Sequence, residues 1–274
     1  IDQVAATSEG RELIQCDLTD IHRLHALVHR REVSGIIHCG AYSGPMVARD
    51  NPYAIVQVNV LGTANVLELA RIRGIPRFVF CSSTSAYGNT PKGPVSEDVP
   101  LAPTSVYGAS KVAGEQLVSS YSNQHGTDGV SVRLSWVYGP RRKTDCMIRT
   151  MIEDALRARP TRFLWGRDFS RQYIHVDDAA AALVSALEKG SLPRRVYTVT
   201  GGTYVTLGEI GEVVRRVLPS ADIQLEPGPD PVEDGQEEFD ISAARRDLGF
   251  QPRQSLENGI RRYAEWLKAR MPTS

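Results

Sequence analysis

Short apolar runs alternate along this chain with longer stretches of helical periodicity. Such alternation is typical of βαβ units, in which helices join parallel strands and cover both faces of one sheet. We therefore predict an α/β fold built on a doubly wound parallel sheet. The runs that predict strands are Glu12–Cys16, Gly35–Cys39, Arg77–Ser82, Val130–Leu134 and Arg195–Val199. The stretches that predict helices are Ile21–Arg31, Pro52–Arg73, Val106–His125, Cys146–Arg159, Val176–Lys189, Leu207–Leu218 and Leu256–Ala269.

Bulk composition limits the class of partner. The chain has 274 residues, of which 41% are apolar and 23% charged, and a formal net charge of zero. It contains no basic block of the kind that binds nucleic acid and no apolar run long enough to span a membrane. It shows no signal peptide, and the spacing of its cysteines (Cys16, Cys39, Cys81 and Cys146) is not that of metal ligands. We expect a cytoplasmic protein with reduced thiols and a small-molecule substrate.

One polar stretch indicates a specific chemistry. Tyr107 and Lys111 lie four residues apart in a predicted helix and therefore share one of its faces. A tyrosine hydroxyl ordinarily titrates near pH 10, and a neighbouring ammonium lowers that pKa by stabilising the phenolate. The pair is thus a candidate general base for an alcohol, and the hydroxyl of Ser83 is placed to hold the same alcohol oxygen. The trio suits oxidation of a carbinol or reduction of a carbonyl, with hydride passed to or from a nicotinamide.

The spacing of Tyr107 and Lys111 is weak evidence by itself, because the chain has 10 tyrosines. The order of the surrounding segments is more specific. A buried strand ends in hydroxyl residues, a loop rich in Pro and Gly runs from Gly88 to Pro103, and a helix begins near Ser105. This order places Ser83 at the carboxyl end of a strand, where open α/β sheets bind ligands.

The start of the chain resembles the middle of a nucleotide-binding unit. Such a unit opens with a strand, a glycine-rich turn and a helix that together hold a pyrophosphate. The chain instead opens on Ile1-Asp2, which reads as the end of a second strand, so we expect roughly thirty further residues upstream. Asp2 would accept the adenosine ribose hydroxyls and favour NAD over NADP, since a carboxylate repels the additional phosphate. An exposed terminal aspartate is the equally supported alternative.

Several segments together resemble a known family. They are Asp17-Leu18, Ile37-His-Cys-Gly-Ala41, Asn59-Val-Leu-Gly-Thr-Ala-Asn65, Ser82-Ser-Thr-Ser-Ala-Tyr-Gly88, Tyr107-Gly-Ala-Ser-Lys111, Arg171-Gln-Tyr-Ile-His-Val-Asp-Asp178 and Leu248-Gly-Phe-Gln-Pro252. In this order they resemble the extended short-chain dehydrogenase/reductases, or NAD-dependent epimerase/dehydratases. The resemblance implies a Rossmann-type domain formed by residues 1–135 and about 174–200. A smaller substrate-binding region would then comprise residues 136–173 and 201–274.

The resemblance also implies roles for individual residues. Tyr107 would be the base, Lys111 would bind the nicotinamide ribose and lower the pKa of Tyr107, and Ser83 would orient the reacting oxygen. The residues expected to bind NAD are Asp2, Asp17, Leu18, Cys39, Gly40, Ala41, Asn59, Tyr107 and Lys111. Those expected to bind substrate are Ser83, Thr84, Trp136 and Arg171.

Some positions depart from the family pattern. The dehydratases of the family carry Asp-Glu after the catalytic hydroxyl residue, whereas this chain has Thr84 and Ser85, which disfavours dehydration. The sugar-nucleotide epimerases usually carry Asn where this chain has Trp136. They also carry an arginine that pairs with the diphosphate in the loop before the last helices. The corresponding segment here, Leu225–Asp240, contains no arginine and several carboxylates. That charge pattern is unfavourable for a diphosphate.

Three functions remain open at this stage. The first is an NAD(P)-dependent oxidoreductase or epimerase of a sugar or sugar nucleotide. The second is an NAD-dependent dehydrogenase of a small hydroxy acid or free sugar acid, which Trp136 and the arginine-free loop favour. The third is a non-catalytic relative that cannot hold the cofactor. The family resemblance also implies a homodimer formed through the helices Pro52–Arg73 and Val106–His125.

Overall fold

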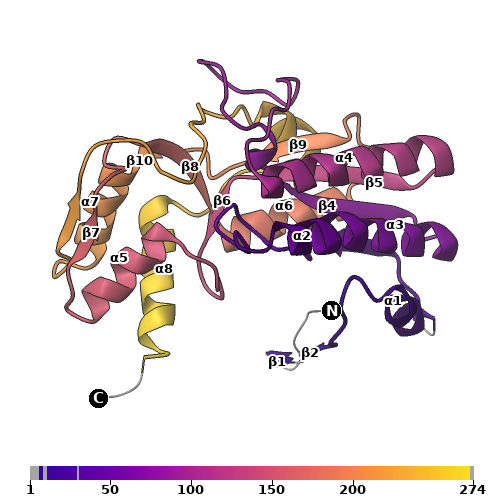
Figure 1. Ribbon diagram of the computed structural model, residues 1–274, viewed down its shortest axis with the longest axis horizontal. Coiled ribbons are helices and arrows are strands. Elements are labelled where there is room, and N and C mark those ends of the chain that lie inside the picture. Colours follow the sequence, from indigo (N-terminus) through magenta and orange to yellow (C-terminus); the bar gives the residue numbers. More distant parts are fainter. Residues whose placement is uncertain (1–5, 9–10, 30, 272–274) are drawn as a thin grey trace.

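The computed structural model describes residues 6–8, 11–29 and 31–271. Its central element is a parallel sheet with strand order β3-β4-β5-β9, at the right of Figure 1. These strands are β3 (Gly35–His38), β4 (Arg77–Ser83), β5 (Asp128–Leu134) and β9 (Val196–Val199). All three pairings between them are parallel, with His38 beside Phe80 and Ser83 beside Leu134. The sheet confirms the predicted α/β class.

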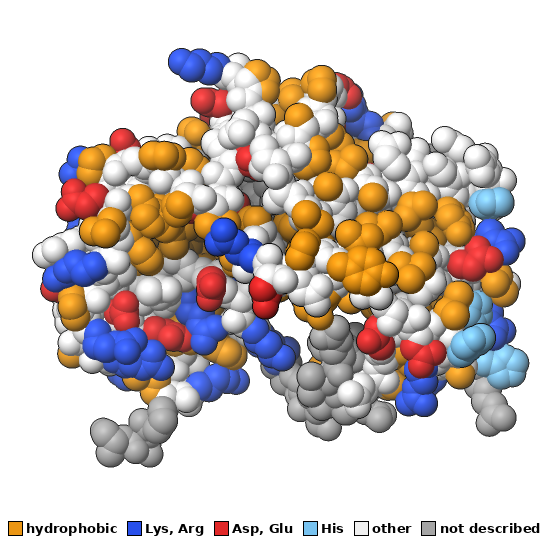
Figure 2. Space-filling view, viewed as in Figure 1, with side chains coloured by type: hydrophobic (Ala, Val, Ile, Leu, Met, Phe, Trp, Pro, Cys, Tyr) orange, Lys and Arg blue, Asp and Glu red, His pale blue; other side chains and the backbone are white. Residues whose placement is uncertain are grey.

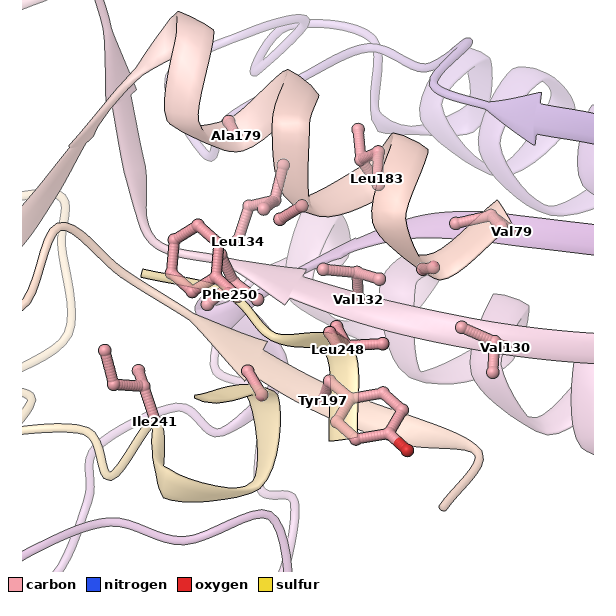
Figure 3. Packing of buried hydrophobic residues seen from close by; sticks show 14 of the residues in the cluster. Val79, Val130, Val132, Leu134, Ala179, Leu183, Tyr197, Ile241, Leu248 and Phe250 are labelled. Atoms are coloured by element: carbon pink, nitrogen blue, oxygen red, sulfur yellow. The ribbon is translucent and has the colours of Figure 1, made fainter. Parts of the chain in front are cut away.

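Helices cover both faces of this sheet because β4 is apolar on both sides. Its alternating residues Phe78 and Phe80 face α3 and α4, whereas Val79 faces α6. Figure 3 shows Val79, Val130 and Val132 beneath Ala179 and Leu183 of α6. The helical elements of this first region are α1 (Ile21–Val28), α2 (Pro52–Ile55), the π-helical segment η1 (Val56–Leu61), α3 (Gly62–Arg73), α4 (Val106–His125) and α6 (Val176–Glu188).

A second region lies beyond the carboxyl end of β5, at the left of Figure 1. It contains a three-stranded sheet of order β10-β8-β6 and a parallel pair, β11 and β7. Apolar residues of its three helices, among them Ile148, Ile210 and Ile260, form a separate core. The elements are β6 (Trp136–Tyr138), α5 (Met147–Leu156), β7 (Thr161–Phe163), β8 (Ser170–His175), β10 (Tyr204–Thr206), α7 (Leu207–Val217), β11 (Ile223–Leu225) and α8 (Leu256–Lys268).

The end of the chain returns to the first sheet. Ile241, Leu248 and Phe250 pack into the core beneath β5 and β9, as Figure 3 shows. The π-helical segment η3 (Ala244–Leu248) lies in this stretch. Upstream, Phe239 packs against Tyr87, which follows the 3₁₀ turn η2 (Thr84–Ala86). Residues 226–238 therefore run between the two regions.

The strand predicted over Glu12–Cys16 is present only as the shorter β2 (Arg11–Leu13), and it does not pair with the parallel sheet. Among the described residues of this segment, β2 pairs only with β1 (Ala6–Ser8), in an antiparallel arrangement. A local pairing of this kind closes a short loop and costs little chain entropy. The other predicted strands and all seven predicted helices are present, with shifts of a few residues at their ends.

Charged side chains of both signs are interspersed on the face seen in Figure 2. One continuous helical stretch in the described part of the chain, Pro52–Arg73, has the length and apolar content of a membrane span. Half of its most apolar 18-residue window is buried in the protein, as expected for a helix packed on a sheet.

Candidate active site

Helix α4 presents three polar side chains along one face. Tyr107, Lys111 and Glu115 are spaced four residues apart and all three are buried. The hydroxyl of Ser105 accepts a hydrogen bond from the amide of Gly108 and so caps the helix. At Gly108 a Cβ atom would lie 2.4 Å from the carbonyl oxygen of Ser85. Glycine therefore allows α4 to approach the loop after β4.

Ser83, Tyr107 and Lys111 line one pocket of about 610 Å³. The Nζ atom of Lys111 donates to the carbonyl oxygen of Cys81 at 2.7 Å and lies 5.7 Å from the centre of the Tyr107 ring. The hydroxyl oxygen of Ser83 accepts a hydrogen bond from the amide of Ser85 at 3.1 Å, which fixes its orientation. The structure thus brings together the three residues predicted to be catalytic. Thr84 and Trp136, predicted to bind substrate, line the same pocket.

A buried ion pair connects α4 to the sheet. The guanidinium of Arg133 donates to both carboxylate oxygens of Glu115, at 2.9 and 2.7 Å. The hydroxyl of Ser82 donates to the same carboxylate at 2.5 Å. Bidentate pairing of this type has a defined geometry, so it fixes the position of α4 relative to the ends of β4 and β5. The role of Glu115 was not predicted from the sequence, although its four-residue spacing from Lys111 was a usable signal.

A second hollow of about 1010 Å³ adjoins the pocket. Leu18, Cys39, Gly40 and Ala41, all predicted to contact the cofactor, line it, and Cys39 and Ala41 also line the pocket. These residues therefore form one surface that leads to Lys111. Asp17 is exposed, and its carboxylate accepts hydrogen bonds from the amide and hydroxyl of Thr19. Asp2 lies outside the described residues.

Asn59, a predicted cofactor residue, is buried and holds backbone in place. Its side chain exchanges two hydrogen bonds with the backbone of Tyr42, at 2.8 and 3.0 Å. It also donates to the hydroxyl of Ser110 on α4. Asn59 lies in η1, and π-helical segments are frequent near functional sites. Its contacts connect the loop after β3 to the helix that carries Tyr107.

Arg171, predicted to bind substrate, is buried in an ion pair. Its Nη2 atom donates to the carboxylate of Asp230 at 3.0 Å. Its guanidinium stacks between the rings of Trp136 and Phe169, at 4.3 and 4.7 Å from their centres. The same Asp230 carboxylate accepts hydrogen bonds from the amides of Val232 and Glu233. Asp230 therefore positions the turn that follows it and partly neutralises Arg171.

That turn brings Glu233 to the wall of the pocket. Burial raises the pKa of Glu233 to about 8, and the nearby carboxylates of Asp230 and Asp234 add to this effect. The positive charges of Arg171 and Arg142 oppose it. The Oε1 atom of Glu233 is buried without a hydrogen-bond partner among the described residues. A neutral carboxyl group at this wall is able to donate a hydrogen bond. Glu233 could not be predicted from the sequence, because one carboxylate in an acidic loop carries no spacing signal.

The two histidines near the site, His38 and His175, make structural contacts. His38 is buried, its ring contacts the Thr63 hydroxyl at 3.0 Å, and burial together with Lys111 lowers its pKa to about 3. His175 caps α6 by accepting the amide of Asp177, and burial lowers its pKa too. Within the described ranges, no cluster of His, Cys, Asp and Glu side chains has the arrangement of a metal site.

Comparison with known proteins identifies the family. The sequence profile of the "NAD dependent epimerase/dehydratase family" matches residues 2–200. The chain belongs to that family. The UDP-glucose 4-epimerase of Mycolicibacterium smegmatis is 31% identical to it over 96% of this chain and 85% of the relative. The UDP-glucuronate 4-epimerase of Thermodesulfobacterium geofontis is 28% identical over 95% of this chain and 80% of the relative.

A solved structure agrees with this assignment. The UDP-glucose 4-epimerase of Thermus thermophilus, in complex with NAD, matches with a TM-score of 0.86 and 27% identity. The match covers 97% of this chain and 87% of that one. This epimerase/dehydratase family member is therefore an enzyme of the extended short-chain dehydrogenase/reductase type.

Proposed function

We propose that this chain catalyses the NAD-dependent oxidation or epimerisation of a secondary alcohol on a sugar or sugar nucleotide. The observation that carries the proposal is the convergence of Ser83, Tyr107 and Lys111 on one pocket. The family assignment and the relatives that act on UDP-sugars support the same class of substrate.

The residues around the pocket fit NAD. The surface from Leu18 to Ala41 is partly apolar and suits an extended ligand, and Lys111 ends it with a cation that can donate to ribose hydroxyls. When bound, NAD supplies the hydride acceptor and donor.

The chain's own residues supply the proton chemistry. The Tyr107 hydroxyl, in its ionised form, takes the proton of the substrate alcohol. The Lys111 ammonium lies 5.7 Å from the centre of the Tyr107 ring and places a positive charge beside it. Ser83 holds the alcohol oxygen, since its own oxygen is already oriented by the Ser85 amide. The Glu115–Arg133 pair keeps α4 at the sheet and so maintains the distance between Tyr107 and Ser83.

Replacement of Tyr107 by Phe tests the proposed base. We expect Tyr107→Phe to lower kcat by about 10²–10⁴-fold while the affinity for NAD, measured by calorimetry, changes little. Tyr121→Phe is the matched control, because Tyr121 lies on the same helix but its hydroxyl donates to Glu68, outside the pocket. An unchanged rate in Tyr107→Phe would exclude the proposed role of this residue.

Absorbance of the reduced cofactor separates the two reactions. An epimerase returns the hydride to its product, so the absorbance at the reduced nicotinamide band stays flat during turnover. A dehydrogenase releases a ketone, so that absorbance rises in step with product.

A smaller substrate without a diphosphate is the second candidate, and the Arg171–Asp230 pair favours it. The two guanidinium groups that stack near Trp136 are already bonded: Arg171 to Asp230, and Arg142 to the backbone carbonyls of Val137, Thr144 and Asp145. Asp230 partly neutralises Arg171, whose Nη1 atom is buried without a partner among the described residues, and Arg142 would have to break its bonds to pair with a phosphate.

Competition by UDP tests this second candidate. If the substrate lacks a diphosphate, millimolar UDP will not inhibit turnover of a free sugar acid, and Asp230→Asn will introduce inhibition by releasing Arg171. Strong inhibition of the unaltered protein by UDP would contradict this candidate and support a sugar nucleotide.

A further inference from the structure

Two cysteine side chains lie next to each other where the pocket and the adjoining hollow meet. Cys81 belongs to β4, and Cys39 directly follows β3. The register places His38 beside Phe80, so the next position places Cys39 beside Cys81. Neighbouring strands lie about 4.8 Å apart, a separation that falls within the Cα distances of disulfides, about 4.4–6.8 Å.

The surroundings of this pair favour reactivity. Cys39 is exposed, Cys81 is half-buried, and both line the pocket that contains Lys111. The Lys111 ammonium, 2.7 Å from the Cys81 carbonyl oxygen, stabilises a thiolate nearby. Interaction with the neighbouring Cys39 thiol and this charge lower the pKa of Cys81. Lys111 is bonded to the backbone of Cys81 itself, so we take Cys81 as the nucleophile and the more exposed Cys39 as the resolving thiol.

The remaining cysteines differ in each respect. Cys16 and Cys146 are buried, and they lie in the separate cores of the two regions. Burial raises the pKa of Cys16. Reactivity at Cys39 and Cys81 is thus a property of their position and not of cysteine in general.

We propose that Cys39 and Cys81 form a redox-modified dithiol site, which low-molecular-weight disulfides convert to an intramolecular disulfide. The Cys81 thiolate attacks one sulfur of oxidised glutathione, the S–S bond of that reagent breaks, and one glutathione thiolate leaves. Cys39 then loses its proton to solvent, and its sulfur attacks the mixed disulfide at Cys81. The second glutathione leaves. In total, two protein thiols are oxidised and one glutathione disulfide is reduced to two glutathione thiols.

The location of the site couples this modification to cofactor binding. Cys39 lines both hollows, so a disulfide redirects a side chain of the proposed NAD surface. We expect oxidation to weaken NAD binding. Since coupling between two binding events is reciprocal, bound NAD must in turn oppose oxidation. This part of the inference depends on the proposed function, whereas the formation of the disulfide does not.

Peptide mapping tests the dithiol. The purified protein is incubated with oxidised glutathione, with or without saturating NAD, and then quenched with an alkylating reagent, digested and analysed by mass spectrometry. We expect a cross-linked peptide pair that contains Cys39 and Cys81 and lacks two hydrogen atoms, with Cys16 and Cys146 remaining as thiols. NAD should suppress the cross-link, and dithiothreitol should remove it and restore NAD binding.

Two results would overturn the proposal. One is full alkylation of Cys39 and Cys81 after oxidation, and the other is a stable glutathione adduct on Cys81 with no cross-link. Cys81→Ala must abolish the cross-link. If that variant fails to fold, phenylarsine oxide gives an independent test on the unaltered protein. It should bind one equivalent per chain before oxidation and none afterwards, because it requires two neighbouring thiols. A cross-link that forms in a protein unable to bind NAD would refute the proposed function and leave the dithiol intact.

Discussion

Tyr107, Lys111 and Glu115 occupy successive turns of α4, and each has a different surrounding. Tyr107 and Lys111 face the pocket, whereas Glu115 faces Arg133 within the protein. The helical repeat thus places two groups suited to chemistry and one anchoring group on a single face. The pattern of Tyr107 and Lys111 was readable from sequence because four-residue spacing survives in any helix.

The contacts of Glu233 and Arg171, in contrast, could not be predicted from the sequence. The contacts of both depend on Asp230, which is 59 residues from Arg171 in sequence. Only the tertiary structure brings these three groups together. The sequence indicated that the loop is acidic, but it could not indicate which carboxylate pairs with Arg171 and which faces the pocket.

The raised pKa of Glu233 predicts a pH-dependent stability. In the folded protein Glu233 keeps its proton up to about pH 8, whereas in the unfolded chain it loses it near its ordinary pKa, about 4.3. The folded state therefore binds more protons between these values, and stability falls as pH rises through that window. Glu233→Gln, neutral at every pH, should raise stability at pH 8 by up to roughly 5 kcal/mol and change it little at pH 4.

Thermal unfolding at the two pH values measures this effect. Glu226→Gln is the control, because Glu226 is exposed in the same loop and its replacement should leave the pH profile unaltered. Equal melting temperatures for Glu233→Gln and the unaltered protein at pH 8 would show that Glu233 is ionised in the folded state.

At the scale of elements, the approach of α4 to the loop after β4 determines the geometry of the pocket. Gly108→Ala would place a Cβ atom 2.4 Å from the Ser85 carbonyl oxygen and 2.9 Å from Cβ of Pro103. We expect the helix to shift outward, with a loss of about 1–3 kcal/mol of stability and a larger fall in kcat than in NAD affinity. Urea unfolding and steady-state kinetics give the two quantities.

Gly190→Ala is the appropriate comparison for that variant. A Cβ atom at Gly190 would meet no atom within 4 Å, so stability and turnover should stay close to those of the unaltered protein. If Gly108→Ala behaved in the same way, the close contact would not control the position of Tyr107.

The strands and helices of the first sheet were predictable because they are long and apolar. The short strands β6, β7, β8, β10 and β11 were not, since most have three residues and show no readable alternation. β8 is longer, but its residues Arg171, Gln172 and His175 are polar and buried. Their burial depends on specific partners, such as the amide of Phe239 for Gln172, and hydrophobic pattern cannot reveal it.

At the scale of the whole molecule, exposed apolar side chains support the expected homodimer. Tyr53, Val56, Leu61 and Ile72 on α2, η1 and α3, and Val106 on α4, are all more than 40% exposed. Figure 2 shows hydrophobic side chains gathered over this part of the molecule. Such a surface is typical of an interface between subunits.

Sedimentation tests the dimer directly. We predict a dimer at micromolar concentration and a monomer for Leu61→Glu, because a buried unpaired carboxylate would oppose association. Leu164→Glu is the control, since Leu164 is 85% exposed but lies in the second region. A monomer in the unaltered protein would count against this interface.

The side chain of Gln236 has a consequence for any attempt to divide the protein. Its amide nitrogen donates to the carbonyl oxygens of Thr84 and Gly88, at 2.7 and 3.1 Å. These bonds stabilise the turn that follows Ser83. Gln236 itself lies beyond the part of the chain that matches the family profile, which ends at residue 200. A fragment cut at that boundary would lose these bonds and uncover Tyr87 and Val95, which Phe239 shields. The fragment that carries Ser83, Tyr107 and Lys111 is therefore not a self-sufficient catalyst, and its reactive hydroxyl depends on residues supplied more than 150 positions later in synthesis.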